Sequence, residues 1–62
     1  MTLNQIAQQA MDYLDSVGVA ADYNMQKDKF FVITDDYLII LRESQSDPIG
    51  ILRKHYPQKS PA

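Results

Sequence analysis

The sequence predicts a small α+β domain, in which an N-terminal amphipathic helix packs on a three-stranded antiparallel meander and a short C-terminal helix follows. Three observations support this prediction. Apolar residues recur at helical spacing near the N-terminus, a segment of alternating polarity comes next, and two apolar runs flank Asp35-Asp36. A chain of 62 residues accommodates one domain. We assign it to residues 1–56 and expect 57–62 to be a disordered C-terminal tail.

The first element is predicted to be a helix over residues 3–17. Five apolar residues lie three or four apart and form one stripe, which Ile6 widens: Leu3, Ala7, Ala10, Leu14 and Val17. Thr2 and Gln5 have the spacing of a capping box at the N-terminus. Gly18 occupies the position at which a glycine commonly ends a helix.

Three strands are predicted to follow the helix. Residues 19–25 alternate in polarity, as expected for a half-buried strand, and residues 26–29 form a turn. Residues 30–34 and 37–41 are almost continuously apolar, which is typical of strands covered on both faces. The Asp35-Asp36 pair between them suits a two-residue hairpin turn.

The segment 48–56 has two interpretations. As a helix, it would have Asp47 as N-cap, Pro48 in the first turn and basic residues in the last turn. Alternatively, residues 47–50 form a type I turn and a fourth strand follows. We favour the helix, and Pro57 ends either element.

The hairpin register divides the apolar side chains between two faces. A two-residue turn places Phe31, Ile33, Leu38 and Ile40 on one face. The other face holds Phe30, Val32, Thr34, Tyr37, Ile39 and Leu41. If the first turn contains an even number of residues, Tyr23 and Met25 join this larger face, which the N-terminal helix should cover. An odd number would exchange the two assignments.

The smaller face is a candidate partner-binding surface, because it combines an apolar centre with a polar rim. The predicted contact residues are Phe31, Ile33, Leu38 and Ile40, with Lys29, Arg42 and Asn24 around them. Three occupants are compatible with the sequence. The 48–56 segment could fold back over the face, a second copy could cover it, or a different protein could bind there.

Composition argues against several kinds of site. The chain contains no Cys and one His, so disulfides and thiolate metal sites are excluded, and we predict no metal or cofactor. It contains no nucleophile elbow or phosphate loop, so we predict neither enzymatic activity nor a small-molecule substrate. The sequence also has no signal-peptide pattern and no apolar run long enough to span a membrane, so we expect a cytoplasmic protein.

Charge is unevenly distributed along the chain. Residues 1–36 hold six aspartates against two lysines, whereas residues 37–62 hold four basic residues against two acidic ones. Asp12, Asp15 and Asp22 could form an acidic surface that binds a protein meant for nucleic acid. Arg53, Lys54 and His55 are candidate phosphate contacts, although the net charge of −2 disfavours binding to nucleic acid.

The preferred functional hypothesis is a small non-enzymatic interaction or regulatory protein that binds through its surface as a homodimer or to another protein. Its size and plain architecture are typical of bacterial or phage accessory proteins. The first alternative is an acidic decoy that inhibits a nucleic-acid-binding or defence protein. The second is a weak nucleic-acid binder that acts through the basic C-terminal segment.

Overall fold

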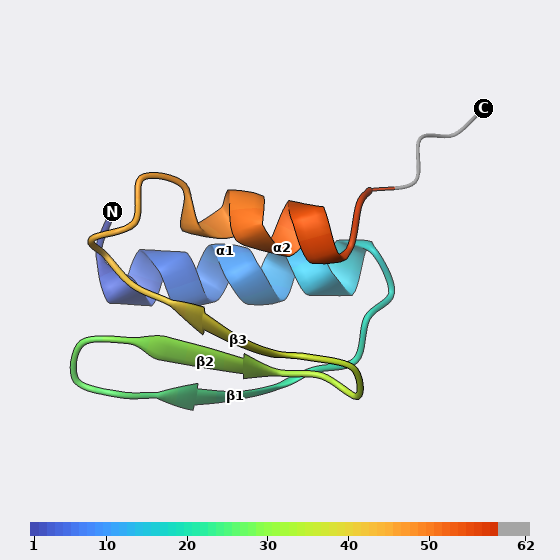
Figure 1. Cartoon of the computed structure of the whole chain (residues 1–62), viewed down its shortest axis with the longest axis horizontal. Coiled ribbons are helices and arrows are strands. Elements are labelled where there is room, and N and C mark those ends of the chain that lie inside the picture. Colours follow the sequence, from blue (N-terminus) through green and yellow to red (C-terminus); the bar gives the residue numbers. More distant parts are fainter. Residues whose placement is uncertain (59–62) are drawn as a thin grey trace.

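The computed structural model describes residues 1–58 and has two layers, with both helices on one side of an antiparallel sheet (Figure 1). The elements follow in the order α1 (Leu3–Ser16), β1 (Asp22–Met25), β2 (Phe30–Ile33), β3 (Leu38–Leu41) and α2 (Pro48–His55). The α+β prediction is therefore confirmed, and the C-terminal element is the favoured helix rather than a fourth strand.

Hydrogen bonds at both ends define α1. The Gln5 amide donates to Thr2 Oγ1 at 3.2 Å, and the Thr2 amide donates to Gln5 Oε1 at 2.8 Å, which completes the predicted capping box. At the C-terminus the Gly18 amide donates to the Asp15 carbonyl, and the Val19 amide donates to the Leu14 carbonyl. Gly18 has φ 73°, so this end is a Schellman motif in which glycine adopts the left-handed conformation.

The sheet has the strand order β1-β2-β3, and both hairpins have the predicted register. The Gln26 amide donates to the Lys29 carbonyl at 2.8 Å, and the Thr34 amide donates to the Tyr37 carbonyl at 2.9 Å. The first turn therefore contains an even number of residues. As a result Met25 pairs with Phe30, while the second hairpin pairs Ile33 with Leu38.

The hydrophobic core lies between the sheet and the two helices. Alternate residues of β2 and β3 face the helices, and each helix contributes its apolar side. The buried residues are Leu3, Ile6, Ala10, Leu14, Phe30, Val32, Ile39, Leu41, Ile49 and Leu52. The larger predicted face is thus the one that the helices cover.

Asp47 and Tyr56 fix the two ends of α2. Asp47 caps the N-terminus by accepting a hydrogen bond from the Gly50 amide at 3.0 Å. At the other end the Tyr56 carbonyl accepts a hydrogen bond from the Tyr13 hydroxyl at 2.6 Å. The Tyr56 hydroxyl lies 2.7 Å from Thr34 Oγ1. The helix is therefore tied both to α1 and to the β2–β3 turn.

The first strand differs from its prediction. We expected a half-buried strand over residues 19–25, but β1 begins at Asp22 and all four of its residues are exposed. The reason is that α1 packs over β2 and α2 packs over β3, so β1 extends beyond the cover of the helices. In the predicted tail, residues 57–58 have no regular secondary structure, and residues 59–62 lie outside the described part of the chain.

Candidate binding surface

The sheet face that points away from the helices is apolar at its centre. We call Phe31, Ile33, Leu38 and Ile40 the open face. The register places Phe31 beside Ile40 and Ile33 beside Leu38, so the four side chains form a compact square. Leu38 is 63% exposed, Ile33 42% and Ile40 37%, whereas Phe31 is half-buried. The four residues thus lie together as predicted.

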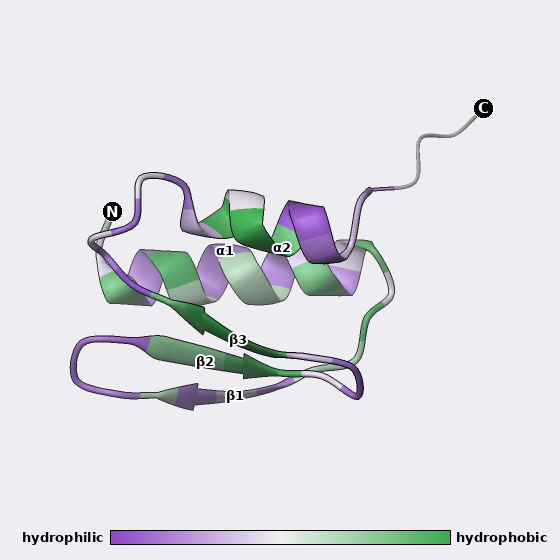
Figure 2. Ribbon diagram, in the orientation of Figure 1, coloured by the Kyte–Doolittle hydropathy of each residue, from purple (hydrophilic) through white to green (hydrophobic). Residues whose placement is uncertain are grey.

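Neither helix covers the open face. One hypothesis was that residues 48–56 would fold over it, but Ile49 and Leu52 are instead buried in the core on the opposite side of the sheet. Figure 1 shows α2 beside α1 on that side. Figure 2 shows β2 and β3 as hydrophobic along their lengths, while β1 is more hydrophilic. Strands β2 and β3 therefore have apolar residues on both faces, but the helices cover only one of these faces.

Polar residues border the open face on β1 and at one end. The register pairs Asp22 with Ile33 and Asn24 with Phe31, so both polar residues belong to this side of the sheet. Lys29 lies at the end nearer Phe31, and its Nζ is 5.6 Å from the centre of the Phe31 ring. This distance is within the range of a cation–π contact. The Lys29 side chain therefore extends along the open face.

Acidic residues gather at the other end. Asp22, Ile33 and Asp35 line the same shallow depression beside the β2–β3 turn. Asp36, the second turn residue, is also exposed. The pair Asp35-Asp36 thus forms the predicted turn, and its carboxylates lie at the end of the sheet opposite Lys29.

The structure does not gather Asp12, Asp15 and Asp22 into one surface. Asp12 and Asp15 are exposed on α1, in the helix layer, and Asp12 accepts a hydrogen bond from the Gln8 amide group. Asp22 lies on the opposite face of the sheet, beside Ile33. The three carboxylates are therefore divided between the two layers.

The basic residues Arg53, Lys54 and His55 are exposed in the last turn of α2. The Arg53 guanidinium lies 5.9 Å from the centre of the Tyr13 ring on α1. The His55 ring lies 4.4 Å from the Tyr37 ring in the β2–β3 turn. Arg53 and His55 therefore pack against different elements and do not converge on one point, as a shared phosphate site would require.

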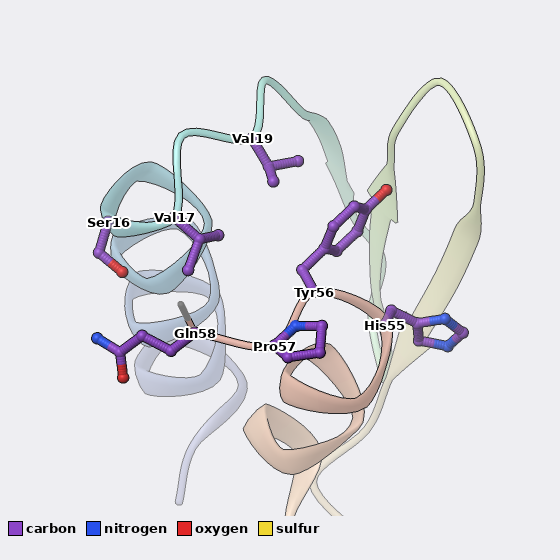
Figure 3. A pocket seen from close by; sticks show the side chains of 7 residues that line it. All are labelled: Ser16, Val17, Val19, His55, Tyr56, Pro57 and Gln58. Carbon is purple, nitrogen blue, oxygen red and sulfur yellow. The ribbon is translucent and has the colours of Figure 1, made fainter. Parts of the chain in front are cut away.

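A pocket lies between the C-terminal ends of the two helices, lined by Ser16, Val17, Val19, Tyr56 and neighbouring residues (Figure 3). The imidazole ring of His55 points away from the space between the helices. The Ser16 hydroxyl donates to the Tyr13 carbonyl at 2.6 Å. The hydroxyls of Ser16 and Tyr56 thus have hydrogen-bond partners outside the pocket.

Two features on the helix side of the sheet were not predicted from the sequence. The first is a depression between α1 and β1, where Met11, Tyr23, Met25 and Phe30 meet. Tyr23 is 63% exposed and Met25 41%, although both were expected to lie beneath the helix. The second is Glu43, whose carboxylate accepts a hydrogen bond from the Leu3 amide at 2.6 Å. A negatively charged side chain is favourable at a helix N-terminus, which explains this contact. The sequence alone did not indicate it, because Glu43 and Leu3 are far apart in the chain.

Within residues 1–58 no group of three or more His, Cys, Asp or Glu side chains is arranged to hold a metal ion. Neither described helix has the length and apolar character needed to cross a membrane. Comparisons with protein-family models, curated proteins and solved structures give no significant match.

Proposed function

We propose that this chain is a small non-enzymatic protein-interaction or regulatory protein that acts through its open face, and that its partner is a second copy of itself. The cytoplasmic location expected from the sequence belongs to the same proposal. The main support for this proposal is that neither α1 nor α2 covers the square formed by Phe31, Ile33, Leu38 and Ile40.

The energetic cost of leaving this face in water supports the proposal. Burying one large aliphatic or aromatic side chain contributes about 1.5–3 kcal/mol relative to full exposure. A domain of this size has a total stability of only several kcal/mol. Covering even part of the open face would therefore add substantially to the stability of the fold, and a partner would provide that cover.

A second copy is the simplest partner for a face of this kind. Two-fold symmetry requires only that the surface be complementary to itself. Every contact between one residue of the first copy and another residue of the second is repeated with the two copies exchanged. Small domains without disulfides or structural metals commonly gain stability by oligomerisation. This chain contains no Cys.

The test is solution mass measured by light scattering over a concentration series. Wild type should change from monomer to dimer as concentration rises, and Ile40→Asp should remain monomeric because the introduced carboxylate would be buried without a partner. Met25→Asp is the matched control, since Met25 is 41% exposed and Ile40 37%, but Met25 lies on the helix side of the sheet. Circular dichroism checks that both variants fold.

Three outcomes would contradict the proposal. Wild type could remain monomeric at all concentrations, Ile40→Asp could dimerise as wild type does, or Met25→Asp could abolish the dimer equally. The last result would move the interface to the depression between α1 and β1.

A further inference from the structure

The open face and its borders form four rows across the sheet. The two central rows contain the apolar square, with Ile33 and Leu38 in one and Phe31 and Ile40 in the other. Beyond Phe31 lie Lys29 and Arg42, which directly precede Phe30 and follow Leu41, the last pair of the β2–β3 ladder. The row beyond Ile33 is the β2–β3 turn with Asp35 and Asp36. The face is thus basic at one end and acidic at the other.

Two symmetric arrangements bring two such faces together. If the two-fold axis runs along the strands, the strands of both copies point in the same direction, and each charged row meets the same row of its partner. If the axis runs across the strands, the strands are antiparallel, and the acidic row meets the basic row. Like charges that face each other oppose association, whereas complementary charges favour it.

We infer that two copies pack open face to open face with antiparallel strands, so that Asp35 and Asp36 of each copy lie opposite Lys29 and Arg42 of the other. This inference rests on the proposed function and specifies its geometry. A two-fold axis across the strands keeps each strand over its own counterpart. It therefore places Asp35 near the partner's Lys29, along β2, and Asp36 near the partner's Arg42, along β3.

The dimensions of the face indicate that the interface is small. Three strands of four residues, at about 4.8 Å between strands and about 3.3 Å per residue, form a small patch. An interface of this size falls at the low end of specific complexes, below about 1,200 Å² in total. We therefore expect a reversible dimer with a dissociation constant in the micromolar range or weaker, for which the charged rows determine orientation.

The test uses three charge variants and measures their dimer dissociation constants by analytical ultracentrifugation. Lys29→Asp with Arg42→Asp makes both ends acidic and should weaken the dimer by about tenfold or more. Adding Asp35→Lys and Asp36→Lys gives a charge-swapped variant with the wild-type net charge, which should regain the dimer. Arg53→Asp with Lys54→Asp is the control, because it changes the net charge equally on α2 and should have little effect.

Mixing wild type with the charge-swapped variant tests the direction of the strands. In the antiparallel arrangement each protein pairs with itself, because a mixed dimer would place acidic rows against acidic rows. Native mass spectrometry of isotope-labelled wild type with the unlabelled variant should therefore show few mixed dimers. Mixed dimers in excess of the statistical proportion would overturn the antiparallel arrangement.

The outcomes separate this inference from the proposed function. If Ile40→Asp abolishes the dimer but the charge variants leave it unchanged, the open face is the interface and the antiparallel orientation is wrong. If wild type never dimerises, the self-association in the proposed function fails, and this inference fails with it.

Discussion

Leu38 and Leu41 show how position within one strand determines the role of a side chain. Both are leucines of β3, but Leu41 is 0% exposed in the core and Leu38 is 63% exposed on the open face. Successive side chains of a strand point to opposite faces of the sheet, so these two leucines point in opposite directions. The same amino acid therefore packs in the core at one position and is available for binding at the other.

The matched substitutions Leu41→Ala and Leu38→Ala should therefore differ in their effects on stability. Leu41→Ala removes buried volume and should lower the free energy of unfolding by about 2–5 kcal/mol. Leu38→Ala should lower the free energy of unfolding of the monomer by less than about 0.5 kcal/mol. Urea denaturation at a protein concentration low enough to keep the chain monomeric measures both. Equal losses would show that Leu38 belongs to the core.

Gly18 ends α1 in a conformation that L-residues rarely adopt, at φ 73°. No atom lies within 4 Å of the place that a Cβ would occupy, so the cost of a side chain there is conformational rather than steric. Gly18→Ala should destabilise the fold by roughly 1 kcal/mol. Gly18→Asn should lose less, because Asn tolerates this region better. Thermal denaturation compares them, and an unchanged midpoint for Gly18→Ala would contradict this account.

At the scale of elements, α2 depends on the hydrogen bond between Asp47 and the Gly50 amide, 3.0 Å long. Asp47→Ala should lower stability by about 1 kcal/mol because it leaves this N-terminal amide without its cap. Asp47→Asn should preserve most of the stability, since asparagine caps helices equally well. Urea denaturation distinguishes the two variants. Equal losses in both would indicate that the cap contributes through charge rather than through the hydrogen bond.

Local signals predicted most of the elements. The capping box at Thr2, the glycine at position 18 and the two-residue turn at Asp35-Asp36 each act over a few residues, so the sequence alone was sufficient. The same turn fixed the register and thereby the composition of both faces of the β2–β3 hairpin. These features depend on spacing, which is directly visible in a sequence.

Features that depend on the placement of one element over another could not be predicted. Polarity alternates along β1, but whether Tyr23 and Met25 are covered depends on where α1 lies across the sheet. The side on which α2 packs was likewise open, because its apolar residues could have matched either face. The contact between Glu43 and Leu3 joins distant segments and follows only from the assembled fold.

In the whole molecule, two helices cover one side of a sheet in which β2 and β3 carry apolar residues on both sides. Because folding leaves the second side open, we attribute the function to that side and assign its charged ends to orienting a partner copy. Association should stabilise the native state, so the thermal midpoint should rise with protein concentration. Ile40→Asp should show no such rise. A midpoint of wild type that does not depend on concentration would contradict self-association.

A methyl NMR dilution series from micromolar to millimolar concentration would show whether the open face is the surface through which two copies associate. We expect the methyl signals of Ile33, Leu38 and Ile40 to shift progressively with concentration, while those of the core residues Ile6, Leu14 and Leu52 remain fixed. Signals on the open face that do not change over the whole range, or shifts confined to α1 and β1, would contradict it.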